Sequence, residues 1–211
     1  MHSKVEQIVY IVDDDADVRE GVRALLQSVG LQVVALNSTM EFLVHKHSEE
    51  PSCLILDVRL PGLSGLDFQT ELSKAENDIP IIFITGHGDI PMTVKAMKAG
   101  AVEFLTKPLR EQDLLDAVRL ALERDRKRRE LQMQTQSLRS RYDSLSDRER
   151  HVMRLVCAGL MNKQVAAEIG LSEVTVKVHR HNLMKKLDAR SFADLVRMAD
   201  ALQIRGGNDS A

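Results

Sequence analysis

The first 120 residues alternate short apolar runs with amphipathic stretches of helical period, and this alternation leaves few folds open. Five runs are expected to form strands: Ile8–Val12, Gln32–Leu36, Cys53–Asp57, Pro80–Thr85 and Val102–Leu105. Five stretches are expected to form helices: Asp17–Val29, Met40–His47, Leu66–Lys74, Ile90–Ala99 and Gln112–Glu123. Strands that alternate with helices favour a parallel sheet covered on both faces. We therefore predict a doubly wound α/β fold around a five-stranded parallel sheet.

Local signals agree with this fold. The runs Leu54–Leu56 and Ile81–Ile84 are apolar without alternation, which is typical of central strands buried on both faces. Ser38 and Glu41 have the spacing of a capping box at a helix start. Gly30 and Gly100 stand where two of the expected helices should end.

The charge is distributed unevenly along the 211 residues. Residues 1–120 carry 11 basic and 19 acidic side chains, a net charge of −8, whereas the remaining residues carry 18 basic and 12 acidic side chains, a net charge of +6. A basic half indicates a polyanionic partner. We predict an α/β domain over residues 1–122, a helical linker over 123–143 and a basic domain over 144–206.

Two interpretations of the linker stay open. Its leucines recur seven residues apart, as in a coiled-coil seam: Leu131, Leu138 and Leu145. The complementary seam position falls on polar residues: Lys127, Gln134 and Arg141. A sustained heptad repeat therefore fails, and a solvated helical linker is preferred.

The C-terminal pattern is helical throughout. Ser146 and Glu149 have capping-box spacing, and further helix starts are expected at three polar residues: Asn162, Ser172 and Ser191. Gly170 lies in the brief turn between the second and third of these four helices. Short helices joined by a tight glycine-containing turn indicate a helix-turn-helix domain.

The helix over Ser172–Leu187 separates into two faces. Val176, Leu183 and Leu187 should face the core. The candidate DNA-binding residues lie on or beside the opposite face: Val174, Thr175, Lys177, Val178, His181, Asn182 and Lys185. Outward valines can meet thymine methyl groups, and the lysines can reach base edges or phosphates. The chain has no Trp and only 3% aromatic residues, which disfavours the stacking used by single-strand binders.

Polar residues follow the strands of the predicted sheet. Asp13 and Asp14 follow the first strand, Asp57 ends the third, Thr85 ends the fourth, and Lys107 follows the fifth. The carboxyl ends of parallel strands border one crevice, so these side chains should converge there. Clustered carboxylates suit Mg²⁺, and a hydroxyl and an ammonium group can pair with phosphate oxygens. Asp57 is best placed to attack a phosphoryl group, which would give an acyl phosphate.

Motifs in both halves resemble a known family. The α/β half resembles the receivers of two-component response regulators through four segments: Val12–Asp15, Leu54–Gly62, Ile84–Asp89 and Phe104–Pro108. The helical half resembles the LuxR/NarL-type output domain through five more: Leu145–Glu149, Gly159–Asn162, Val165–Ala166, Ser172–His179 and Lys186–Leu187. Together they look closest to the FixJ-like branch.

The resemblance implies a flavodoxin-like receiver in which a sensor histidine kinase phosphorylates Asp57. Mg²⁺ would be held by Asp14, Asp57 and the backbone carbonyl of Arg59, with Asp13 assisting through water. Three other residues would serve the phosphoryl group and the switch: Lys107 as its contact, Thr85 as the residue that moves toward it, and Phe104 as the aromatic that turns inward. The Lys107–Pro108 peptide bond would be cis.

For the output, the resemblance implies a homodimer that forms on phosphorylation and binds double-stranded promoter DNA at paired half-sites, usually as an activator. RNA polymerase is a further candidate partner. Apolar runs as short as Ile81–Ile84 cannot cross a bilayer, so we expect a cytoplasmic protein without membrane contact.

Two other classes stay open. A magnesium-dependent phosphatase-like enzyme is disfavoured because the chain lacks a glycine-rich phosphate loop, so we expect no enzyme activity of that kind. A phosphate-indifferent DNA-binding or interaction protein would use the acidic half as a docking surface.

Overall fold

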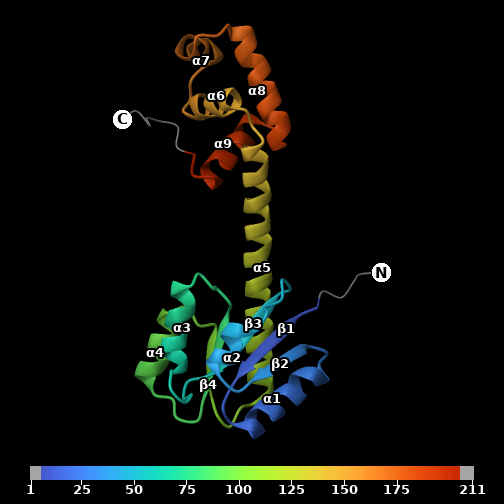
Figure 1. Cartoon of the computed structure of the whole chain (residues 1–211), viewed down its shortest axis with the longest axis vertical. Helices are drawn as coiled ribbons and strands as arrows, with labels where there is room; N and C mark the ends of the chain where they lie inside the picture. Colours follow the sequence, from blue (N-terminus) through green and yellow to red (C-terminus); the bar gives the residue numbers. More distant parts are fainter. Residues whose placement is uncertain (1–5, 205–211) are drawn as a thin grey trace. The chain divides into compact units, whose positions relative to one another are not determined.

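The computed structural model describes residues 6–204 and contains a five-stranded sheet in the order β2-β1-β3-β4-β5 (Figure 1). Its strands are β1 (Ile8–Val12), β2 (Gln32–Leu36), β3 (Ser52–Asp57), β4 (Ile81–Thr85) and β5 (Glu103–Thr106). Each neighbouring pair of strands is parallel. This order and direction confirm the predicted doubly wound fold.

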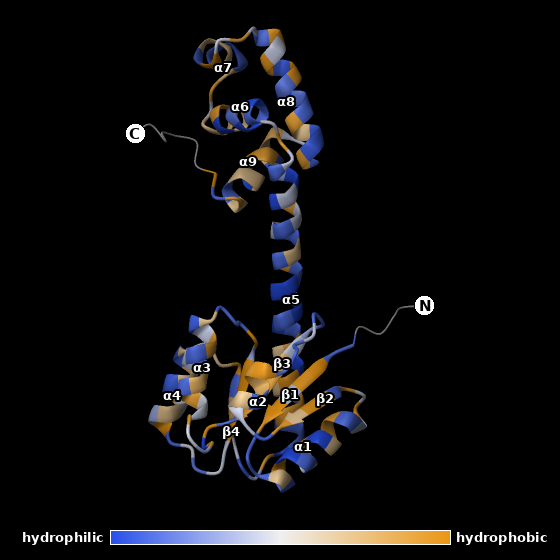
Figure 2. Cartoon of the chain, viewed as in Figure 1, coloured by the Kyte–Doolittle hydropathy of each residue, from blue (hydrophilic) through white to orange (hydrophobic). Residues whose placement is uncertain are grey.

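Helices cover both faces of the sheet. The first four are α1 (Ala16–Ser28), α2 (Thr39–Val44), α3 (Gly65–Lys74) and α4 (Ile90–Lys98). One face packs against α1 and the start of α5 (Glu111–Asp143), through residues such as Leu26 and Val118. The other packs against α2, α3 and α4, through residues such as Phe42 and Phe68. The strands are correspondingly the most continuously apolar part of the chain (Figure 2).

The strand register brings the carboxyl ends of the central strands level with one another. Val12 pairs with Leu56 across β1 and β3, and Asp57 pairs with Ile84 across β3 and β4. The residues that follow these strands therefore emerge at one edge of the sheet, as the sequence predicts.

Helix α5 (Glu111–Asp143) has 33 residues and does not end near Glu123, where the predicted helix stops. The chain divides into two compact units, residues 1–129 and 130–211, and the division falls inside α5. In the first unit, Asp125 of α5 is completely buried, although the stretch was expected to be solvated. The predicted domain boundaries at 122 and 143 stay predictions.

The second unit contains the end of α5 followed by α6 (Asp147–Cys157), α7 (Asn162–Ile169), α8 (Glu173–Leu187) and α9 (Phe192–Ala201). Leu145 is buried in its core and Leu138 packs against that core, whereas Leu131 is 64% exposed. The three leucines therefore do not form one continuous seam, because Leu138 and Leu145 pack in the core of the second unit and Leu131 does not.

Helix starts follow the sequence with two exceptions. Ser146, Ser172 and Ser191 cap α6, α8 and α9, and Ser146 forms a full capping box with Glu149. Asn162 does not cap α7; Met161 occupies the cap position, and its amide donates to the side chain of Gln164. At α2, Ser38 accepts from the amide of Glu41, but the Glu41 carboxylate accepts from the amide of Asn37 instead of closing the box.

Candidate functional site

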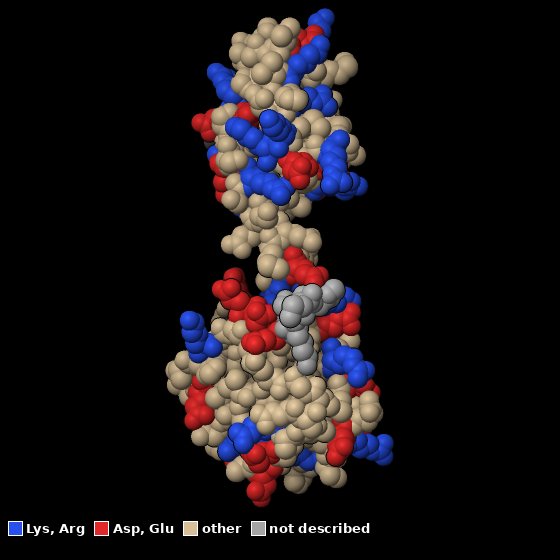
Figure 3. Space-filling view, turned by 90° about the vertical axis from the view of Figure 1, so that its right-hand side faces the viewer, with Lys and Arg blue, Asp and Glu red and all other residues tan. Residues whose placement is uncertain are grey.

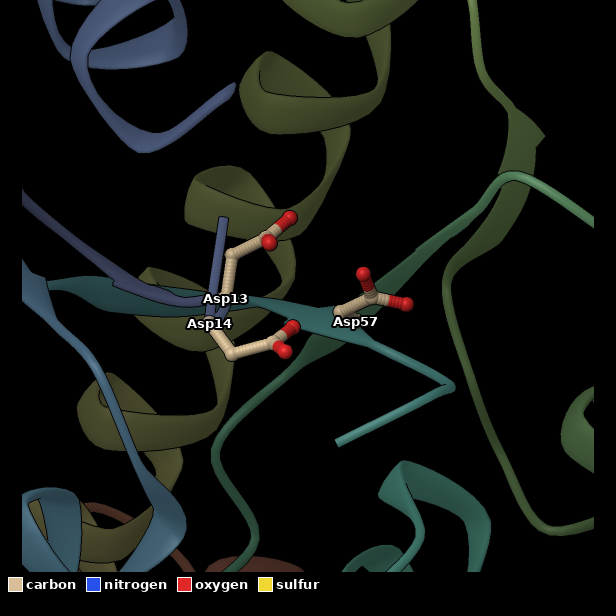
Figure 4. Close-up of side chains that lie close together, drawn as sticks. All are labelled: Asp13, Asp14 and Asp57. Carbon is tan, nitrogen blue, oxygen red and sulfur yellow. The ribbon is translucent and has the colours of Figure 1, made fainter. Parts of the chain in front are cut away.

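Three carboxylates gather at the carboxyl edge of the sheet (Figure 4). Asp13 and Asp14 follow β1, and Asp57 is the last residue of β3; one oxygen from each lies within 4.8 Å of the others. Within residues 6–204 this is the one group of three or more potential metal-ligating side chains. The sequence predicted this convergence, and the structure confirms it.

Lys107, directly after β5, bridges two of the carboxylates. Its Nζ donates to Asp13 Oδ2 at 2.6 Å and to Asp57 Oδ2 at 2.7 Å. Burial lowers the pKa of Lys107, but the hydrogen bonds to the two carboxylates outweigh it, so the net pKa lies above its ordinary value. Lys107 is therefore positively charged and balances part of the acidic cluster.

The three acidic residues differ in their access to solvent. Asp13 and Asp57 are buried, whereas Asp14 is exposed. Burial raises the pKa of Asp13, although the ammonium group of Lys107 and the amide of Asp15 oppose the rise. The amide of Arg59 donates to Asp57 Oδ1 at 2.9 Å, and Asp14 and Arg59 line one groove of about 420 Å³ beside the cluster. A small group can therefore approach from the Asp14 side.

The oxygen donors suit a hard divalent cation. Asp13 and Asp57 are already paired with Lys107, whereas among the residues that the structure describes the exposed Asp14 carboxylate has no ion-pair partner. A cation in the groove would meet this carboxylate first. The residues present therefore fit a magnesium ion.

Thr85 and Phe104 lie on β4 and β5, the two strands next to β3 on that side. Thr85 is completely buried, and its hydroxyl accepts a 3.3 Å hydrogen bond from the amide of His87, so it is engaged by its own loop. Phe104 is half-buried, with its ring 6.1 Å from the ring of Phe83. The Lys107–Pro108 peptide bond is cis, as the resemblance implied.

The candidate DNA-binding residues line the outer side of α8. Val176, Leu183 and Leu187 are completely buried, which confirms the predicted inner face. Six of the seven candidates are exposed; Thr175 is half-buried, and its hydroxyl is 2.8 Å from the hydroxyl of Ser172. Lys and Arg side chains are prominent on the face of this unit seen in Figure 3.

Two contacts that the sequence analysis missed hold α8 in place. The buried carboxylate of Glu149 on α6 accepts from Lys186 Nζ at 2.7 Å. At the end of α5, Arg141 donates to the carbonyl of Leu187 at 3.2 Å and lies 3.6 Å from Asp188. Lys186 and Leu187 carry part of the family resemblance, but no local signal in the sequence indicates that they contact Glu149 and Arg141.

Both halves match models of known domain families. Residues 9–119 match the response regulator receiver domain, and residues 143–199 match the luxR family of bacterial regulatory proteins. The chain belongs to the response regulator family. Within this response regulator, the acidic cluster lies in the receiver, and α8 lies in the luxR-type DNA-binding domain.

Relatives span the full arrangement of both domains. Nodulation protein W of Bradyrhizobium diazoefficiens is 59% identical over 202 residues, which cover 96% of this chain and 89% of that protein. The transcriptional regulatory protein FixJ of the same species is 38% identical over 191 residues, covering 90% of this chain and 93% of FixJ. The solved structure of response regulator StyR is 50% identical, covers 92% of this chain and 98% of that chain, and has a TM-score of 0.82.

The response regulator is thus a DNA-binding transcription regulator of the FixJ-like kind. In residues 6–204 no helix is both long enough and apolar enough to cross a membrane.

Proposed function

We propose that Asp57 accepts a phosphoryl group from a sensor histidine kinase and that this reaction controls DNA binding. The observation that carries the proposal is the bridge from Lys107 to Asp57 and Asp13 beside the exposed Asp14. A carboxylate oxygen of Asp57 forms a bond to phosphorus while the bond from phosphorus to the kinase histidine nitrogen breaks. The receiver supplies the acceptor and holds the transferred group.

We assign the metal ligands to Asp14, Asp57 and the backbone carbonyl of Arg59, with Asp13 acting through water. A bound Mg²⁺ would neutralise charge on these carboxylates and on the phosphoryl oxygens. Lys107 can pair with a phosphoryl oxygen, because its ammonium group already lies 2.7 Å from Asp57 Oδ2. Burial of the cluster strengthens this pairing.

We further propose that the phosphoryl group draws the Thr85 hydroxyl away from the His87 amide and lets Phe104 turn inward. The exposed apolar side chains of α4 support a dimer on that side: Ile90, Val94 and Met97 are 81%, 44% and 41% exposed. Dimerisation pairs two α8 helices and raises their effective concentration on double-stranded promoter DNA. We propose that the phosphorylated dimer acts in the cytoplasm as a transcription activator, with RNA polymerase as a candidate partner.

The test is intact mass after incubation with acetyl phosphate, with and without Mg²⁺. We expect a single phosphoryl adduct on the wild type that requires Mg²⁺ and is lost in Asp57→Asn. The matched control is Asp78→Asn, an exposed aspartate in the loop before β4 at the opposite end of the strand, which should keep the adduct. An adduct that survives in Asp57→Asn would contradict the assignment of Asp57 as the acceptor. No adduct on the wild type under rapid quenching would leave the phosphate-indifferent DNA-binding protein as the better hypothesis.

A further inference from the structure

Gly88, in the loop between β4 and α4, lacks a side chain where one would meet two other residues. A β-carbon placed on Gly88 would lie 2.8 Å from Phe104 Cε1 and 3.1 Å from Thr85 Cγ2. The first distance is shorter than real β-carbon contacts allow, so the atoms would have to move apart. The backbone of Gly88 is outside the left-handed region, so its conformation alone does not require glycine.

The two residues that Gly88 accommodates are the two assigned above to the switch. The Thr85 hydroxyl oxygen accepts a hydrogen bond from the amide of His87, and the edge of the Phe104 ring lies in the space that a side chain at position 88 would fill. The present arrangement of Thr85 and Phe104 therefore depends on the missing side chain.

We propose that Gly88 is a positioning residue that stabilises the resting arrangement of Thr85 and Phe104, and so sets the balance between the resting and active states of the receiver. This inference rests on the proposed function. It adds a third residue to the switch, one that acts by the space it leaves and that touches neither the phosphoryl group nor the metal site.

A steric argument gives the direction of the effect. In Gly88→Ala, the new methyl group excludes the Phe104 ring edge from its present place and presses on the Thr85 methyl group. Overpacking of this kind disfavours the arrangement that contains it, by about 1 to 3 kcal/mol. Arrangements in which both side chains have left the space around the new methyl group do not carry this cost. A two-state equilibrium then shifts toward the moved state, by about 5- to 150-fold for typical overpacking.

The neighbouring Gly86 provides a matched control. It lies two residues earlier in the same loop, and a β-carbon on Gly86 would meet nothing within 4 Å. Gly86→Ala therefore makes the same chemical change and the same loss of backbone freedom without the contact to Phe104.

The experiment follows the ring of Phe104 directly in the full-length protein. The five phenylalanines are labelled with 4-fluorophenylalanine, and the signal of Phe104 is assigned as the one missing in Phe104→Leu. Fluorine NMR spectra are recorded for the wild type with and without acetyl phosphate and Mg²⁺, and for unphosphorylated Gly88→Ala and Gly86→Ala. Sedimentation equilibrium gives the dimer dissociation constant of each sample.

We expect the Phe104 signal of unphosphorylated Gly88→Ala to move toward its position in the phosphorylated wild type. The dimer dissociation constant should fall by about 25-fold or more while the moved state remains the minor one, because each of the two protomers gains about 5-fold or more in that state. Gly86→Ala should match the wild type. Gly88→Ala should have no further effect in a Phe104→Leu background, where the colliding ring is gone; an equal effect there would mean general loop damage and would overturn the proposal.

The same data separate this inference from the proposed function. If acetyl phosphate moves the wild-type signal and Gly88→Ala does not, the role of Gly88 is wrong and the phosphorylation switch stands. If acetyl phosphate labels Asp57 but leaves both the signal and the dimer constant unchanged, the switch through Phe104 is wrong, whatever Gly88→Ala does.

Discussion

The buried carboxylate of Asp125 on α5 accepts a 2.8 Å hydrogen bond from the backbone amide of Ser52, the first residue of β3. The same carboxylate accepts from the guanidinium groups of Arg128 and Arg129, and Arg129 also donates to the carbonyl of Glu49 at 2.8 Å. This network attaches α5 to the amino end of the strand whose other end carries Asp57.

Replacing Asp125 by Ala should lower the free energy of unfolding by about 3 kcal/mol, because the change leaves the Ser52 amide and two guanidinium groups without their buried acceptor. The midpoint of urea unfolding, followed by circular dichroism, measures the loss. Asp116→Ala is the control, since that aspartate pairs with Arg119 on the exposed side of the same helix. Equal midpoints for the two variants would show that the network contributes little.

Replacing Lys107 by Met should slow phosphorylation of Asp57 by acetyl phosphate by about two orders of magnitude, since the transferred group loses a preplaced cation. A time course of intact mass gives the rate. Lys95→Met removes a largely exposed lysine that lies 3.9 Å from Asp67, and its rate should equal that of the wild type. An unchanged rate in Lys107→Met would contradict the assigned role.

Glu149 should make the stability of the DNA-binding domain depend on acid pH. Burial raises the pKa of Glu149, but the hydrogen bonds from Lys186 and Ser146 outweigh it and hold the pKa below its ordinary value of about 4.5. A lowered pKa in the folded state contributes stability above the unfolded value, and this contribution is lost as the pH falls through the folded value.

Glu149→Gln should therefore lower the free energy of unfolding by about 1 kcal/mol at pH 7, a modest loss because Lys186 is partly exposed. The loss should be smaller at pH 3 to 4. Urea unfolding at both pH values measures it. Glu173→Gln, at the more exposed pair with Lys177, should show almost no cost at either pH. A cost for Glu149→Gln that is independent of pH would rule out the ionised pair as its source.

Replacing both Lys177 and Lys185 by Ala should abolish specific DNA binding, because both side chains are exposed on the outer face of α8. A fragment selected by the wild type from a random-sequence pool serves as the probe, and affinity is measured over a range of salt concentrations. If both lysines contact phosphates, each contact removed should reduce the salt slope by about 1. The control is Lys127→Ala, on the exposed side of α5, which should leave both the affinity and the salt slope unchanged. If the double variant also binds with unchanged affinity and slope, the assignment of α8 as the recognition helix is wrong.

Much of the fold of both units follows from the sequence, because hydrophobic periodicity and helix-capping residues act locally. The strands Ile8–Val12 and Gln32–Leu36 begin and end where their apolar runs do, and Ser146 caps its helix as its spacing with Glu149 indicates. The acidic cluster also follows, since a parallel sheet places the residues after its central strands at one edge.

What the sequence could not reveal depends on distant partners. Asp125 stands among arginines in a polar stretch, and only the position of Ser52, 73 residues earlier in the chain, makes it a buried acceptor. The role of Gly88 could not be predicted from the sequence either, because it depends on side chains from β4 and β5 that lie beside Gly88 only in the folded protein. Helix α5 continues past Glu123 because residues 124–143 contain no Gly, Asn or Pro that would end it, so the predicted stop had no physical cause.

The attachment through Asp125 changes how the basic half should be counted. Residues 121–129 carry five basic and two acidic side chains, so they hold half of the excess of +6, yet they belong to the receiver unit. Residues 130–211 carry 13 basic and 10 acidic side chains, a net charge of only +3. So small an excess gives weak attraction to random DNA. The protein should dissociate quickly from non-specific DNA, so its residence time on the chromosome should depend mainly on its specific contacts at the operator.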